Sequence, residues 1–359
     1  MSSSFLRYVL LGGALAVLAS TAVVHGASDP EDPLLSIGEF AVVDRDEADL
    51  PYSYTYYIPH SAFEREITAV VVVVPGGGKD RVYEDAIATS RFVVRYYLHY
   101  KNLFPRPKNL SEATGLIFFS AAVPNPFPEV CEDWGLQDSD TSYARALDYN
   151  SLTVAAGDFF RPDLKYLEVF DSFLSELEKL GLVVDPRMLL TGGSAGAGWT
   201  HRFAMLHPER VRAAAPSGTS LWTMPLMEYG GSSLPYPLGI GGLEEHGIRV
   251  DLEAFKRIPF LIHMGIDDNK IPQDMLAFLR TGEDVTIAGA TVEEARAYAD
   301  SFGKLGPQRA ESYHEQLLLL GMEATLFLCN TGHGMGNCYT EPRIMEFFNA
   351  LTLSPSGWD

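Results

Sequence analysis

The sequence predicts an α/β fold in which a mostly parallel central sheet carries helices on both faces. Short apolar runs alternate with segments of helical spacing along the chain, which is typical of repeated strand–helix–strand units. Two of these runs, 67–74 and 116–123, are apolar at all but one position, as in strands that are buried on both faces. The candidate catalytic residues also follow expected strands, where the sites of such sheets form.

The elements expected from these patterns follow one another along most of the chain. Strands are expected at 52–58, 67–74, 116–123, 188–191, 211–215, 259–263 and 323–328. Helices are expected at 167–180, 195–206 and 341–351, the first ending before Gly181 as a C-cap.

The segment 216–258 shows no regular pattern and is rich in glycine and proline. Long irregular segments within a domain are often functional, so it is a possible cap over a pocket, lined by Trp222, Tyr229 and Tyr236. The alternative is a surface loop. With or without a cap, residues 28–359 are expected to form one α/β domain.

The overall charge argues against a nucleic-acid partner. The chain has 27 basic and 47 acidic residues, a net charge of −20. Such a surface repels phosphate backbones and anionic membranes and favours solubility.

The first 27 residues have the order of a secretory signal peptide. Arg7 precedes an apolar run that ends at Val24, and the small residues Gly26 and Ala27 follow it. We expect a secreted protein with residues 1–27 removed. A retained membrane anchor is the alternative and would be the chain's contact with a membrane.

The three cysteines, Cys131, Cys329 and Cys338, allow one disulfide and leave one thiol in an oxidising compartment. A Cys329–Cys338 bridge would stiffen the segment around His333, whereas the alternative is three buried small side chains. Asn109-Leu-Ser111 is a glycosylation sequon, which has a meaning only in a eukaryotic source.

Ser194 is the candidate nucleophile. The pattern Gly192-x-Ser194-x-Gly196 lies between an expected strand and an expected helix, which is what a nucleophile elbow needs. The tight turn leaves no room for side chains two residues before or after the serine. A phosphate-binding loop is disfavoured, because no Gly-Lys-Ser/Thr follows.

A serine hydroxyl needs a base and the base needs an acid. His333, in the glycine-rich segment after strand 323–328, is the candidate base. Asp267 and Asp268 follow strand 259–263 and are both possible as the acid. The order serine, aspartate, histidine is the one expected of an α/β sheet with an elbow.

The oxyanion hole requires two amides. The amide of Ala195 lies at the start of the helix after the elbow, and Pro75-Gly76-Gly77-Gly78 follows strand 67–74. We expect the second amide to be that of Gly77, with Gly78 as the alternative.

These residues together resemble the α/β-hydrolase superfamily over about residues 35–351. Within it, the stretch 192–211 is most similar to secreted polyhydroxybutyrate depolymerases and feruloyl esterases. Their aspartate comes in a G-x-x-D-x-x-V-P segment, and Gly265 to Pro272 matches with Ile271 for valine, so the resemblance implies Asp268. Their oxyanion loop is often His-Gly-Gly; Pro75 replaces that histidine here.

The expected function is ester hydrolysis through an acyl-enzyme on Ser194, with a small or polymeric ester as substrate. No metal or organic cofactor is implied, since HExxH and cysteine–histidine ligand spacings are absent from the sequence. The alternatives are a serine peptidase or amidase with the same triad and a non-catalytic binding protein on this fold.

Overall fold

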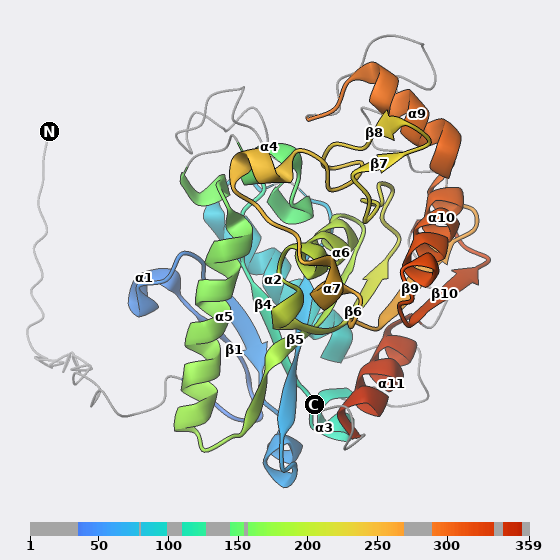
Figure 1. Ribbon diagram of the computed structural model, residues 1–359. Coiled ribbons are helices and arrows are strands. Elements are labelled where there is room, and N and C mark those ends of the chain that lie inside the picture. Colours follow the sequence, from blue (N-terminus) through green and yellow to red (C-terminus); the bar gives the residue numbers. More distant parts are fainter. Residues whose placement is uncertain are drawn as a thin grey trace, which may run out of the picture. The chain divides into compact units, whose positions relative to one another are not determined.

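The computed structural model describes residues 35–78, 80–98, 110–126, 144–153, 157–268, 289–333 and 340–353. An eight-stranded sheet runs through them in the order β1-β2-β4-β3-β5-β6-β9-β10 (Figure 1). The first two pairings are antiparallel and the other five are parallel, which confirms the predicted fold class. The strands are β1 (Phe40–Val43), β2 (Tyr54–Tyr57), β3 (Thr68–Val74), β4 (Ile117–Ala121), β5 (Val184–Gly193), β6 (Val211–Ser217), β9 (Phe260–Gly265) and β10 (Ala324–Cys329).

The valine-rich strand β3 shows why this sheet needs helices on both faces. All of its residues are buried. Val70, Val72 and Val74 point into one core cluster, whereas Val71 and Val73 point into the other, as the two-residue period of a strand requires. A continuous apolar run is therefore stable here because each face of the sheet has its own core.

Two sets of helices cover the two faces. Side chains of α5 (Pro162–Lys179), α6 (Ala195–Leu206), α9 (Val292–Phe302) and α10 (Gly306–Leu319) pack into the first core. Side chains of α2 (Tyr83–Leu98) and α11 (Thr340–Leu353) pack into the second, with α3 (Leu110–Thr114) beside them. The expected helix 167–180 begins earlier, because Pro162 occupies the first turn, where a missing N–H costs nothing. The shorter helices are α1 (Arg45–Ala48), α4 (Tyr149–Thr153) and α7 (Leu252–Phe255).

The segment 216–258 is more ordered than its composition suggests. It completes β6, forms a hairpin from β7 (Glu228–Tyr229) and β8 (Ser232–Ser233), and contains α7. The expectation that Trp222 and Tyr236 line a pocket is wrong. Both are buried in the first core, and Trp222 stacks on Tyr313 with ring centroids 4.9 Å apart. Tyr229 stays partly exposed, and the cap remains a prediction.

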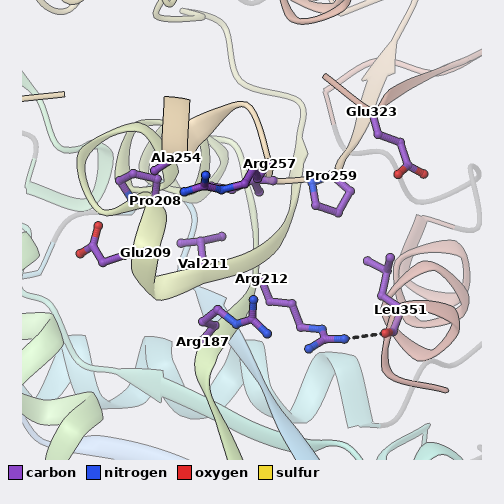
Figure 2. A pocket seen from close by; sticks show the side chains of 11 residues that line it. Arg187, Pro208, Glu209, Val211, Arg212, Ala254, Arg257, Pro259, Glu323 and Leu351 are labelled. Carbon is purple, nitrogen blue, oxygen red and sulfur yellow. Dashed lines mark hydrogen bonds between the residues drawn. The ribbon is translucent and has the colours of Figure 1, made fainter. Parts of the chain in front are cut away.

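A charged cavity of about 420 Å³ lies where β6, β9 and β10 begin, at the opposite end of the sheet from Ser194 (Figure 2). Arg212 donates to the Asp185 carboxylate and, at 2.7 Å, to the Leu351 carbonyl, which ties α11 to the sheet. Burial acts to raise the pKa of Asp185, but hydrogen bonds from Arg187 and Arg212 outweigh it and lower the pKa. The Arg212 contacts therefore have a structural role at this end of the sheet.

His263 lies inside β9 and is fully buried, as expected for a packed histidine. Neither ring nitrogen has a hydrogen-bond partner in the part of the chain that the structure describes. Burial is the main reason, with the charge of Arg343 second, that the pKa of His263 falls from 6.5 to about 4. The folded protein therefore holds this imidazole neutral where an unfolded chain would protonate it.

We expect His263→Leu to remove part of the acid sensitivity of the fold. Between pH 6.5 and 4 the unfolded chain binds the proton and the folded chain does not, so stability falls as the pH falls. At about 1.4 kcal/mol per pKa unit, the wild type should lose about 3 kcal/mol over this window relative to the variant. Urea denaturation at pH 7 and at pH 4 measures the difference. The control is His60→Leu at an exposed position, which should lose as much free energy of unfolding between pH 7 and pH 4 as the wild type does. An equal loss in all three proteins would contradict the prediction.

Candidate active site

The turn from β5 to α6 places Ser194 at the N-cap position of the helix, as the sequence predicted. Its φ is 57° and its ψ is −117°, a conformation that L-residues rarely adopt. The Ser194 amide donates to the Ser217 carbonyl at 2.9 Å, which anchors the turn to the neighbouring strand. Backbone strain is thus concentrated at the candidate nucleophile and held by its surroundings.

The glycines on either side of Ser194 are required by close backbone approach. A Cβ on Gly192 would lie 2.6 Å from the Gly196 carbonyl oxygen and 2.9 Å from that of Val74. A Cβ on Gly196 would lie 2.8 Å from the Pro75 carbonyl oxygen and closer still to that of Val74. These distances agree with the steric argument made from the sequence.

We expect Gly196→Ala to destabilise the protein by about 3 kcal/mol or more, because the new methyl group meets backbone atoms that cannot move aside cheaply. Gly198→Ala is the matched control on the same helix. Its Cβ would make only ordinary contacts, the nearest 3.5 Å away, so it should gain up to about 1 kcal/mol from helix propensity. Chemical denaturation of both variants tests the pair, and equal effects would contradict the steric explanation.

Three side chains form a continuous chain of hydrogen bonds. The His333 Nε2 is 2.9 Å from the Ser194 Oγ, and its Nδ1 is 2.8 Å from the Asp268 Oδ2. A neutral imidazole fits this arrangement when Nδ1–H donates to the carboxylate and Nε2 accepts from the serine. Of the two aspartates left open, Asp268 is buried against the histidine and Asp267 is exposed.

The loops after β9 and β10 are held together by their backbones. The Ile266 amide donates to the Cys329 carbonyl at 2.9 Å, and the Asp267 amide to the Thr331 carbonyl at 3.1 Å. Gly265 permits this approach, since a Cβ there would lie 2.6 Å from the Gly332 carbonyl oxygen. In the sequence Gly265 is only part of a pattern, whereas in the structure it lets the histidine loop reach the aspartate.

Cys329, at the end of β10, is disulfide-bonded, so the reading of three buried thiols is wrong for this residue. Cys131 and Cys338 lie outside the described residues, as do residues 1–27, the expected signal peptide, and Asn109.

The buried guanidinium of Arg309 contributes a positive charge near Asp268. Burial lowers the pKa of Arg309, and the neighbouring Tyr298 and Asp268 act in the opposite direction. Arg309 donates to the carbonyl oxygens of Ser220 and Gly303, at 2.8 and 3.1 Å. These two bonds to backbone oxygens hold the guanidinium in place.

The histidines of the elbow helix have structural partners instead. His201 is buried, its Nδ1 2.7 Å from the Ala197 carbonyl oxygen and its Nε2 accepting from the Thr223 amide at 3.0 Å. His207 at the helix end lies 2.8 Å from Asp163. Both histidines are thus engaged by structural partners and not by Ser194.

The glycine run after β3 lies beside the elbow. Gly76 is in contact range of Gly193 and Ser194, because a Cβ on it would lie 3.0 Å from the Gly193 carbonyl oxygen and 3.8 Å from the Ser194 Cβ. Gly77, the expected oxyanion residue, follows it and is exposed, as is Gly78. Ala195 begins α6, where first-turn amides have no partner within the helix.

A pocket of about 240 Å³ opens at Ser194 and His333. Part of its lining comes from residues that had not been expected at the site: α2 contributes Tyr96 and Tyr97, β6 contributes Ser217, and α11 contributes Glu341. The helical spacing of residues 83–98 was the signal that could have found the first of these. Nothing in the local pattern indicated Glu341.

Comparison with known proteins gives likeness in structure alone. No protein-family model matches the sequence, and no curated protein matches it. A poly(aspartic acid) hydrolase-1 from Sphingomonas sp. KT-1 is 15% identical with a TM-score of 0.48, over 84% of this chain and 94% of its own. LpqC, a poly(3-hydroxybutyrate) depolymerase from Bordetella parapertussis, is 15% identical with a TM-score of 0.47, over 89% and 92%. An S-formylglutathione hydrolase from Agrobacterium tumefaciens is 14% identical with a TM-score of 0.46, over 88% and 95%.

The fold follows from the chain's own topology and geometry. An antiparallel β2 is followed by parallel strands in the order β4-β3-β5-β6-β9-β10, with the elbow after β5. The serine, aspartate and histidine come in that chain order from the carboxyl ends of β5, β9 and β10. The chain has the α/β-hydrolase fold.

Proposed function

We propose that the protein is a serine hydrolase that cleaves carboxylic esters through an acyl-enzyme on Ser194. The observation that carries this proposal is the continuous hydrogen-bond chain from Asp268 through His333 to the Ser194 Oγ, at 2.8 and 2.9 Å. A buried carboxylate, an oriented imidazole and a strained serine at a pocket are the parts that acyl transfer needs.

Each residue then has a defined role. The Ser194 Oγ attacks the ester carbonyl carbon while its proton passes to the His333 Nε2. Asp268 holds the imidazole through Nδ1–H and stabilises the imidazolium that forms. The amides of Ala195 and Gly77 donate to the oxyanion, and the tetrahedral intermediate collapses as His333 protonates the departing alcohol. Water repeats the sequence on the acyl-enzyme, which releases the acid and restores Ser194.

The test is covalent labelling combined with an ester series. The chain without residues 1–27 is treated with a fluorophosphonate probe, the modified residue is mapped by mass spectrometry, and p-nitrophenyl esters of increasing chain length are assayed beside matched anilides. Labelling at Ser194 with ester turnover is the expected result. Faster cleavage of the anilides would favour an amidase. A folded protein without labelling would contradict the proposal and favour a binding protein.

We also propose that the protein is secreted and that residues 1–27 are removed. The disulfide at Cys329 supports this, because disulfides persist in oxidising compartments. N-terminal sequencing of the protein from the culture medium of an expressing cell tests it. Recovery of the intact N-terminus in the membrane fraction would show an anchor instead.

A further inference from the structure

The pocket beside Ser194 contains an unusual number of unsatisfied polar groups. Ser217, Thr340 and Glu341 line it and are only 5%, 3% and 8% exposed. The Ser217 Oγ, the Thr340 Oγ1 and the Glu341 Oε2 are buried without a hydrogen-bond partner in the described structure. Such atoms cost free energy in a fold, and the great majority of buried polar atoms in proteins are paired. Three of them at one pocket indicate a place for a polar ligand group.

The Glu341 carboxyl is held in position while one oxygen stays open. The Tyr96 hydroxyl of α2 donates to it, and so does the backbone amide of Glu341 at the start of α11. These bonds fix the side chain from two elements and leave Oε2 for a ligand. The arrangement is a preformed hydrogen-bonding point, not a flexible surface acid.

The remaining walls restrict the ligand's chemistry. Val73, Val74, Val93 and the ring of Tyr97 also line the pocket, and its described lining contains no lysine or arginine. Desolvation raises the pKa of Glu341. A carboxyl and two hydroxyl groups among apolar walls suit a ligand hydroxyl group, which both donates and accepts hydrogen bonds.

Building on the proposed ester hydrolysis, we propose that this pocket is a specificity subsite that selects esters carrying a hydroxyl group on the acyl or the alcohol portion. Glu341, Ser217 and Thr340 supply the hydrogen-bond partners of that hydroxyl, and the valines hold the carbon chain that bears it. A plain alkyl ester leaves all three buried groups unpaired, and sites of this kind reject substrates that lack the matching group.

Two substrate pairs test the proposal and distinguish a hydroxyl group on the alcohol portion from one on the acyl portion. Glyceryl monobutyrate against propyl butyrate reports on the alcohol side, and ethyl 6-hydroxyhexanoate against ethyl hexanoate reports on the acyl side. We expect the wild type to prefer the hydroxylated member of one pair by about tenfold in kcat/KM. Glu341→Leu should abolish this preference, and Glu341→Gln, which keeps a neutral hydrogen-bonding group, should retain most of it. Glu346→Leu and Glu346→Gln, at an exposed position of the same helix, are the matched controls.

The outcomes are distinct. If Glu341→Leu does not fold by circular dichroism, Ser217→Ala replaces it and should reduce the preference several-fold. Alkyl and hydroxylated esters cleaved equally by the wild type would overturn the subsite and leave the proposed function standing. If the wild type prefers an aminoethyl ester and Glu341→Gln removes that preference, the subsite binds a cationic group and the proposed hydroxyl group is overturned. No ester turnover at all would overturn both proposals.

Discussion

Ser194→Ala is expected to lower kcat for ester hydrolysis by about 10⁴- to 10⁶-fold while the protein stays folded. The variant removes the attacking oxygen, and residues that act as one catalytic unit lose nearly all of their effect when one member is removed. The fold should tolerate the change, because alanine adds no atom to the turn and the Ser194 amide keeps its bond to the Ser217 carbonyl.

Steady-state kinetics and thermal unfolding of the same preparation check this expectation. Ser233→Ala is the matched control, since the serine is exposed on β8 and plays no part in the site. Residual activity of Ser194→Ala within about tenfold of the wild type would mean that another residue is the nucleophile.

Asp268→Asn is expected to lower kcat by about 10³- to 10⁴-fold at neutral pH. The amide can donate to Nδ1 of His333, which places the imidazole proton on Nε2 and prevents that nitrogen from accepting the serine proton. It also removes the negative charge that stabilises the imidazolium. The size of the loss reflects the burial of Asp268, which leaves no water to replace its contact at 2.8 Å.

Asp267→Asn provides the matched comparison one residue away. Its side chain is exposed, and the described contact of Asp267 with the histidine loop is made by its backbone amide, which the substitution keeps. Steady-state kinetics of the two variants compare the two aspartates directly. Equal losses, or a larger loss for Asp267→Asn, would contradict the assignment of Asp268 as the acid.

Glu341 connects the site to the question of substrate. The proposed triad accounts for acyl transfer and does not account for the choice of ester. The pocket residues from α2 and α11 lie on the side of the second core, opposite α6, so the proposed selectivity and the proposed chemistry would come from different layers of the fold. Variants of the pocket are therefore expected to change the ratio of kcat/KM between substrates strongly and to change the fluorophosphonate labelling of Ser194 less.

The sequence alone determined the features that depend on local sterics and period. Gly192 and Gly196 identified the elbow, because no other residue fits where backbone atoms approach so closely. The unbroken valines of β3 predicted a strand buried on both faces, and the structure has a core on each face. His333 and the pair Asp267–Asp268 followed from their positions after strands, because the carboxyl ends of parallel strands meet at one edge of the sheet.

Only the tertiary structure decided which side chains share a surface. The residues by themselves left Asp267 and Asp268 open and the family resemblance implied Asp268, but its contact with His333 depends on how the loop after β9 meets the loop after β10. Trp222 and Tyr236 were expected at a pocket and lie in the core, because burying a large ring against Tyr313 or Leu147 needs partners distant in sequence. In the sequence, Glu341 is an ordinary acidic residue in the first turn of a helix. In the folded protein α2 packs beside it and its carboxyl is desolvated. The local sequence pattern determines which helix, strand or turn a residue can form, whereas long-range packing determines which groups its side chain contacts. Substrate recognition depends on those contacts.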